Sequence, residues 1–140
     1  GVAIVQGGDG VQLRSDWTMR RDELARQVAD RVGDCRLVVD IHGMADRHQL
    51  DLCIGAGQAD QAVGQELVGY FRSLAKGIRI DLNSPFSGSG PHALRSFVSR
   101  TSRSSAIQIE ITRSLRTVDT AIPTAHLVSQ VVSLWLGQQK

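Results

Sequence analysis

The sequence of 140 residues lacks long hydrophobic runs and has only two cysteines. No apolar run approaches the roughly 20 residues of a membrane-spanning helix, so no transmembrane segment is predicted. Cys35 and Cys53 match no zinc-binding spacing and give no disulfide framework. Each lies in an apolar run, so we expect buried, reduced thiols in a reducing compartment. The N-terminus has no signal-peptide pattern, and we therefore expect a cytoplasmic protein without a membrane partner.

The sequence also lacks a strong excess of charge, and it is poor in lysine. A net charge of +2 is too small to indicate a nucleic-acid partner. Lys76 and Lys140 are the only lysines beside 14 arginines. Arginine binds carboxylates in bidentate geometry better than lysine does, although biased composition explains most of this excess. With 41% hydrophobic and 21% charged residues, the composition is typical of one globular domain.

Strand-like and helix-like segments alternate along the chain, which indicates an α/β domain with a mostly parallel sheet. Segment 93–100 fits either a short helix or a strand, and residues 83–92 form a turn-rich loop. Pro123 is suited to the first turn of the last helix. The predicted strands are 2–5, 11–16, 37–41, 50–54, 78–82 and 106–111, and the predicted helices are 19–32, 59–76 and the segment from Pro123.

Polar residues stand at the ends of three predicted strands, where open α/β sheets bind their ligands. Asp40 and His42 are two residues apart, so they share one face of a strand. This pair suits a metal-binding histidine beside a carboxylate, or an acid–base pair. A histidine with only a structural hydrogen bond is the alternative.

Glu110 lies inside an apolar strand, between Ile109 and Ile111. A glutamate in such a place is either exposed on a wet face or lines a cleft, where burial would raise its pKa and suit it to general base catalysis. It is the only acid between Asp81 and Asp119, a stretch that holds five arginines. Those arginines form either a solvated basic face or a pocket for an anionic substrate.

Three motifs together resemble the N-formylglutamate amidohydrolase family: V-V-D-I-H-G at 38–43, L-N-S-P-F-S-G at 82–88 and A-I-Q-I-E-I-T-R-S-L-R at 106–116. The resemblance covers roughly residues 20–135. It implies one domain over residues 1–140 with the fold of zinc carboxypeptidases. That fold is a phosphorylase/hydrolase-like three-layer αβα sandwich with a mostly parallel or mixed sheet. It also implies metal-dependent hydrolysis of an amide bond in a small anionic amino-acid derivative such as an N-formyl-glutamate.

The resemblance also suggests roles for single residues. His42 would be a ligand of a divalent metal, expected to be zinc, with Asp40 beside it. Glu110 would activate the water for attack. Arg113 would hold a substrate carboxylate or the developing oxyanion. The remaining candidates would bind substrate: Asn83, Phe86 and Arg116.

One departure from the family pattern concerns the metal site. The family has a histidine-and-glutamate motif after the first strand, whereas residues 6–10 here read Q-G-G-D-G. Because a catalytic zinc usually takes three protein ligands, we expect either an upstream segment missing from the sequence or a shortened relative that has lost or rebuilt the site. Substitute ligands could come from Asp40, His48, Asp51 or His92.

Two further functions therefore remain open from the sequence. One is a catalytically inactive relative that binds an anionic ligand or a partner protein through its arginine-rich third. The other is a carboxypeptidase or γ-glutamyl peptide hydrolase that shares the same fold.

Overall fold

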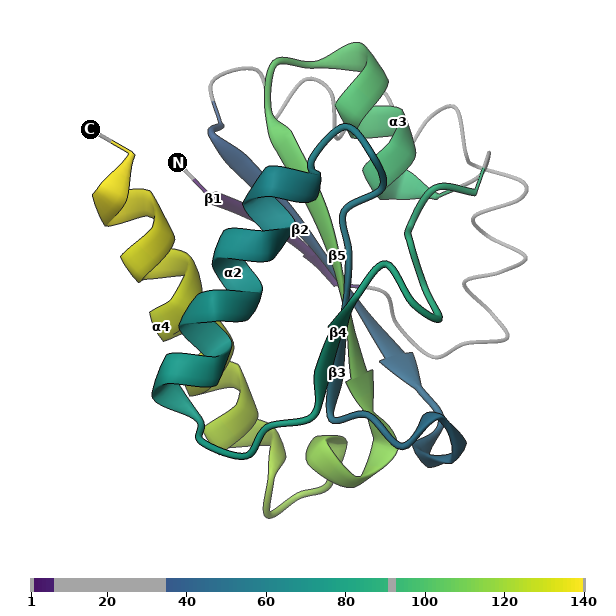
Figure 1. Ribbon diagram of the computed structural model, residues 1–140, viewed down its shortest axis with the longest axis vertical. Coiled ribbons are helices and arrows are strands. Elements are labelled where there is room, and N and C mark those ends of the chain that lie inside the picture. The colour runs from purple at the N-terminus through teal and green to yellow at the C-terminus, as the bar shows by residue number, and fades with distance from the viewer. Residues whose placement is uncertain (1, 7–34, 91–92, 140) are drawn as a thin grey trace.

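The computed structural model describes residues 2–6, 35–90 and 93–139. Five strands, three α-helices and two short 3-10 helices lie in these ranges (Figure 1). In chain order they are β1 (Val2–Gln6), β2 (Leu37–Met44), η1 (Asp46–His48), β3 (Leu52–Gly55), α2 (Gln61–Leu74), β4 (Ile80–Leu82), α3 (Leu94–Thr101), β5 (Ser105–Thr112), η2 (Arg113–Arg116) and α4 (Ala121–Gln138).

The strands form one mixed sheet in the order β1-β2-β5-β3-β4. β1, β2 and β5 run parallel to one another, β3 is antiparallel to β5, and β4 is parallel to β3. The register aligns Asp40 with Gln108 and His42 with Glu110 on the two neighbouring strands β2 and β5. The sheet therefore brings two of the three sequence motifs into contact.

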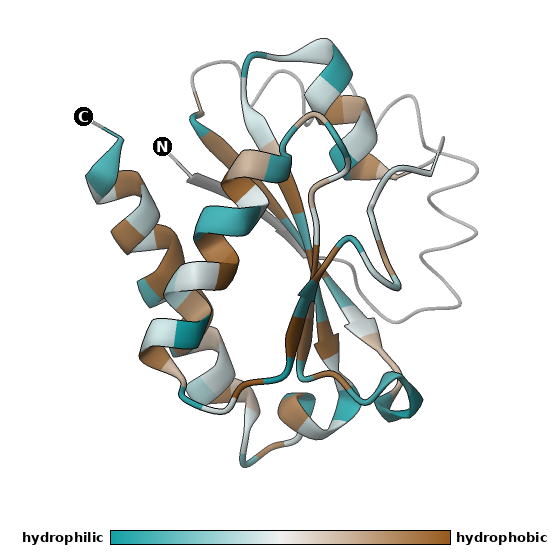
Figure 2. Ribbon diagram, viewed as in Figure 1, coloured by the Kyte–Doolittle hydropathy of each residue, from teal (hydrophilic) through white to brown (hydrophobic). Residues whose placement is uncertain are grey.

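Helices cover both faces of this sheet, which confirms the three-layer αβα sandwich. α2 and α4 pack against each other and against one face of the sheet (Figure 1). Phe71 and Trp135 lie in the core there, which also contains Val39 and Ile107. α3 packs on the other face, over Val38 of β2 and Ala106 of β5. Figure 2 shows hydrophobic and hydrophilic residues alternating along α2, as expected of a helix with one buried side.

Several predicted boundaries shift in the structure. β2 continues to Met44, so Asp40 and His42 lie within the strand and not at its end. The reason is tertiary, because β5 is long enough to pair with β2 up to Thr112. Segment 93–100 is helical, as one of the two alternatives predicted.

The last helix begins at Ala121, two residues before Pro123. Proline is tolerated there because the first turn of a helix has no intrahelical acceptors for its N–H groups. The predicted strand 11–16 and helix 19–32 lie outside the described residues. No helix among the described ranges is long and apolar enough to cross a membrane.

Candidate active site

Four polar residues project from neighbouring strands on the face of the sheet where α3 packs. Asp40 and His42 come from β2, and Gln108 and Glu110 come from β5. Because side chains alternate along a strand, all four point to the same side as Val38 and Ala106, which contact α3. We call these four residues the polar cluster.

His42 and Asp40 form the half of the polar cluster that reaches the surface. His42 Nε2 lies 2.8 Å from Asp40 Oδ2, which confirms that the pair shares one face. The His42 side chain is 43% exposed, whereas that of Asp40 is 6% exposed. The hydrogen bond to Asp40 raises the pKa of His42, opposed by partial burial and assisted by the negative charges of Asp40 and Glu110. The imidazole therefore holds its proton to higher pH than a free histidine.

Gln108 and Glu110 form the buried half of the polar cluster. Glu110 is only 6% exposed, so an exposed position on a wet face is wrong for this residue. Burial raises the pKa of its carboxyl group, while attraction by His42, a hydrogen bond from Gln108 and attraction by Arg116 oppose the rise. Gln108 Nε2 donates that hydrogen bond to Glu110 Oε1 over 2.6 Å. A carboxyl group with a raised pKa accepts a proton more readily than an ordinary glutamate does, which suits it to general base catalysis.

Cys53 of β3 flanks Glu110 on the side away from His42. Its thiol is fully buried, and it donates weak hydrogen bonds to the carbonyl oxygens of Ser84 at 3.3 Å and Phe86 at 3.4 Å. Burial raises the pKa of the thiol. The expectation of a buried, reduced thiol is confirmed for Cys53, whereas Cys35 is half-buried.

The arginines near Glu110 in the sequence do not gather around it in space. Arg113 and Arg116 are exposed on η2, and Arg116 donates to the carbonyl oxygens of Ile111 and Met44. Arg116 is the arginine whose charge acts on Glu110. Arg100 and Arg103 are exposed on α3 and just after it, and Arg95 is buried among backbone carbonyl groups. A single pocket lined by all five arginines is therefore wrong.

The side chain of Asn83, expected to shape the substrate pocket, holds a backbone turn. Its Oδ1 accepts hydrogen bonds from the N–H groups of Ala56 at 2.8 Å and Gly57 at 2.9 Å. Its Nδ2 donates to the carbonyl oxygen of Gly57 at 3.2 Å. The residue adopts a left-handed backbone conformation with φ of 60°. Asn83 thus ties the start of the 83–90 loop to the turn between β3 and α2.

The other predicted ligands lie apart from the polar cluster or outside the described ranges. His48 packs edge-on against Phe86 with ring centroids 5.0 Å apart, which places both rings at the 83–90 loop. Asp51 is bound by Arg79, through Oδ1 to Nη2 and Oδ2 to the backbone N–H, each at 2.8 Å. His92 lies outside the described residues.

The residues present do not complete a metal site by themselves. No group of three His, Cys, Asp or Glu side chains that could hold a metal ion occurs within the described residues. Asp40 and His42 have suitable chemistry, yet they are only two donors and they bind each other. Since a catalytic zinc takes three protein ligands, the zinc expected from the sequence stays a prediction.

Two site residues were missed by reasoning from the sequence. Gln108 was noted only as a polar neighbour of Glu110, although its position two residues earlier on the same strand was a usable signal. Arg95 is one of the five arginines for which the sequence leaves open a solvated basic face or a pocket for an anionic substrate. Its neighbours Leu94 and Val98 give a helical apolar face, but nothing in that pattern indicates a buried guanidinium group.

Comparison with known proteins identifies the family of the chain. The family model of N-formylglutamate amidohydrolase matches residues 17–116, whereas no curated protein sequence matches. Among solved structures, a bacteriophage poly-gamma-glutamate hydrolase matches with a TM-score of 0.57 and 14% identity, over 81% of this chain and 59% of that one. An N-formylglutamate amidohydrolase from Ralstonia eutropha JMP134 matches with a TM-score of 0.54 and 16% identity, over 86% of this chain and 51% of that one.

The two solved structures establish a shared fold, and the chain spans 51% to 59% of their length. The family model covers most of the chain and includes all four members of the polar cluster. The chain belongs to the N-formylglutamate amidohydrolase family.

Proposed function

We propose that this chain is the core of a hydrolase that cleaves the amide bond of a small, anionic N-acyl amino acid such as N-formyl-glutamate. One observation carries the proposal. The buried carboxyl group of Glu110 has a raised pKa, is held by Gln108, and lies on the strand next to the His42–Asp40 pair. Such a group is suited to moving a proton between water and a leaving amine.

Glu110 is the general base of the proposed reaction. It takes a proton from water as the water oxygen attacks the amide carbon, which forms a tetrahedral intermediate. The carbon–nitrogen bond then breaks, and Glu110 returns the proton to the leaving nitrogen. The products are a carboxylic acid and an amine, which ionise to a carboxylate and an ammonium group, and Glu110 is again ionised.

His42 and Arg113 supply positive charge in this proposal. His42 binds Asp40 through Nε2, and its Nδ1 has no hydrogen-bond partner among the described residues. Without a metal, the protonated ring can therefore donate to a carbonyl oxygen as negative charge develops there. If His42 instead holds a metal, its ring is neutral, and the metal would supply this positive charge. Arg113 is exposed and makes no hydrogen bond within the described part of the chain, so its guanidinium group is available for a substrate carboxylate.

We also propose that the intact protein requires a divalent metal, with zinc preferred on the family resemblance. His42 and Asp40 are the candidate ligands on β2, and a third ligand would have to come from outside the described residues. This part of the proposal is separable from the role of Glu110. Measuring bound zinc in wild-type protein and in His42→Ala after dialysis tests it directly.

The central experiment is hydrolysis of N-formyl-L-glutamate by the full chain, with and without added zinc. Glu110→Gln keeps the shape of the side chain but removes the base, and kcat should fall by about 100-fold or more. Glu66→Gln is the matched control, because Glu66 is exposed on α2, on the opposite face of the sheet. Equal turnover by wild-type protein and Glu110→Gln would contradict the proposal.

A second candidate function is a relative that binds an anionic ligand without cleaving it. It is favoured by the lack of a three-donor group among the described residues. Calorimetry with N-formyl-L-glutamate separates the two functions. Binding without any product after prolonged incubation with zinc would favour the inactive relative.

The substrate class needs its own comparison, since one structural relative is a poly-gamma-glutamate hydrolase. N-formyl-L-glutamate, N-acetyl-L-glutamate and short γ-glutamyl peptides form a suitable panel. Faster turnover of the formyl compound supports the primary proposal. Preference for γ-glutamyl peptides would instead assign a peptide hydrolase with the same general base.

A further inference from the structure

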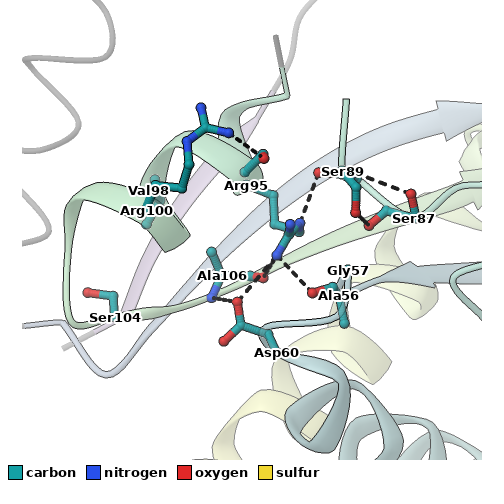
Figure 3. A network of polar contacts seen from close by, with 12 residues as sticks. Ala56, Gly57, Asp60, Ser87, Ser89, Arg95, Val98, Arg100, Ser104 and Ala106 are labelled. Atoms are coloured by element: carbon teal, nitrogen blue, oxygen red, sulfur yellow. Dashed lines mark hydrogen bonds and ion pairs between the residues drawn. The ribbon is translucent and has the colours of Figure 1, made fainter. Parts of the chain in front are cut away.

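Arg95 of α3 is a buried cation that the proposed chemistry does not use. The residue is 4% exposed, and its guanidinium group lies between the 83–90 loop and the sheet (Figure 3). Nε donates to the carbonyl oxygen of Gly88 over 2.9 Å, and Nη1 donates to that of Ala56 over 2.8 Å. A buried guanidinium group is costly unless it is paired and hydrogen-bonded, so these contacts fix its place.

Asp60 supplies the opposite charge and extends the network to β5. Its Oδ2 lies 3.3 Å from Arg95 Nη1 and accepts a hydrogen bond from the N–H of Ala106 over 3.3 Å (Figure 3). Asp60 directly precedes α2, and Ala106 is near the start of β5. One ion pair therefore connects the β3–α2 turn, α3, the 83–90 loop and β5.

The 83–90 loop also comes close to the polar cluster, at Gly88. Its backbone is left-handed, with φ of 64°. A Cβ atom at this position would lie 2.9 Å from Arg95 Cδ and 3.1 Å from Gln108 Oε1. Gly88 thus lies between Arg95 and Gln108, with little room for a side chain.

We propose that Arg95 is a positioning residue for the active site: by holding Gly88 against Gln108, it fixes the amide that orients Glu110. The path has two hydrogen bonds and one close approach. Arg95 donates to the Gly88 carbonyl, and Gln108 Nε2 donates to Glu110. Between them, Gly88 lies so near Gln108 that an added Cβ atom would be 3.1 Å from Oε1. The inference rests on the proposed role of Glu110, and its effect on the Glu110 carboxylate can be measured without turnover.

Two variants perturb this path at different points. Arg95→Lys keeps the charge, but an ammonium group lacks the planar fork that reaches the carbonyls of Gly88 and Ala56 together. Gly88→Ala leaves Arg95 intact and inserts a methyl group between Arg95 and Gln108. The matched controls are Arg100→Lys, at an exposed arginine of α3, and Gly90→Ala, where an added Cβ meets nothing within 4 Å.

Steady-state kinetics with N-formyl-L-glutamate provide the first measurement. Displacing the base without touching a substrate contact should lower kcat by about tenfold and change KM by less than about threefold. Arg100→Lys and Gly90→Ala should leave both constants within about twofold of wild type. A change confined to KM in Arg95→Lys and Gly88→Ala would overturn the inference.

Carbon NMR provides a measurement that needs no activity. The chain has three glutamates, Glu23, Glu66 and Glu110, so labelling the glutamate carboxyl carbons gives three signals. Glu110→Gln identifies the signal of Glu110. Glu66, whose Oε2 accepts a hydrogen bond from Trp135 Nε1 over 2.6 Å, reports on the packing of α2 against α4.

At neutral pH, Arg95→Lys and Gly88→Ala should each move the Glu110 signal and leave that of Glu66 in place. An unmoved Glu110 signal would overturn the inference. Equal movement of both signals would also overturn it, because Arg95 and Gly88 would then stabilise the whole fold and not position Glu110 in particular. If the wild-type chain hydrolyses nothing but the Glu110 signal still moves alone, the proposed function fails and the positioning role stands.

Discussion

Gln108 donates a 2.6 Å hydrogen bond to the carboxylate of Glu110, and both side chains are at least 93% buried on the same face of β5. The two effects on Glu110 oppose each other. Burial disfavours the ionised carboxylate, whereas the hydrogen bond stabilises it. Together with the charges of His42, Asp40 and Arg116, these effects set the pH range in which the carboxyl group of Glu110 is ionised, as the proposed general base requires.

Replacing Gln108 with methionine should move the acid limb of the kcat/KM profile to higher pH. The variant loses the donor that stabilises ionised Glu110, so the pKa of Glu110 rises further above its ordinary value. A general base must be ionised, and activity is therefore lost at a higher pH as the solution is acidified. We expect about tenfold lower kcat/KM at pH 7 and partial recovery at higher pH. Gln65→Met, at an exposed position of α2, is the control, and an unshifted acid limb would contradict this role.

Asn83→Ala should destabilise the protein. The buried N–H group of Ala56 loses its acceptor, and that of Gly57 keeps only the carbonyl oxygen of Ser87 at 3.0 Å. Alanine is also strained at φ of 60°. We expect the free energy of unfolding to fall by about 2 to 3 kcal/mol, measured by urea denaturation. Gln58→Ala, at an exposed position in the same turn, should change it by less than about 0.5 kcal/mol. An unchanged stability of Asn83→Ala would show that these hydrogen bonds add little.

Two glycines of α2 should respond oppositely to alanine. A Cβ at Gly64 would lie 2.6 Å from Leu82 Cδ1 and 2.8 Å from Ala56 Cβ, so Gly64→Ala should cost about 1 to 3 kcal/mol of stability through overpacking. A Cβ at Gly69 would meet nothing within 4 Å, so Gly69→Ala should stabilise by about 0.5 to 1 kcal/mol through helix propensity. Thermal unfolding of both variants checks the pair, and equal effects would contradict the packing seen here.

The Asp51–Arg79 pair should make stability depend on pH in the acid range. Arg79 lowers the pKa of Asp51, so this pair stabilises the fold above the unfolded value of about 3.9 and the contribution is lost as pH falls through the folded pKa. The Arg79 side chain is 59% exposed, which limits the expected loss in Asp51→Asn to about 0.5 to 1 kcal/mol at pH 7.

Urea denaturation at pH 7 and at pH 3 measures that loss. The difference between wild-type protein and Asp51→Asn should shrink at the lower pH. Asp119→Asn, at an exposed position before α4, serves as the reference for removing a surface charge. A difference that stays constant between the two pH values would contradict the assigned pairing.

The sequence was informative wherever local pattern and tertiary burial agree. The apolar run at 37–41 and the alternation around Glu110 each predicted a strand correctly, because strand residues here are buried by helices on both faces. The two-residue spacing of Asp40 and His42 predicted a shared face, which the 2.8 Å contact confirms. The family resemblance, carried by the motifs that include these residues, is also confirmed.

The sequence failed where long-range contacts decide the outcome. Five arginines close in sequence to Glu110 suggested one basic pocket, yet Arg95 is buried by contacts with residues up to 39 positions away. The substrate-binding role of Asn83 stays a prediction, and the sequence does not indicate that its amide holds backbone groups of a distant turn. The spacing of residues in the sequence predicts neither set of hydrogen bonds, because a buried polar side chain bonds to whichever partner the folded chain brings next to it.

By itself, then, the sequence determined the α/β class, the strands that contain Asp40, His42 and Glu110, and the face on which Asp40 and His42 lie, since side-chain alternation is a property of any strand. Only the tertiary structure decided that β2 and β5 are neighbours in a register that places His42 beside Glu110. It also decided which arginine is buried and which are exposed. Strand order and register depend on the packing of helices on both faces, and that packing joins residues far apart in the chain.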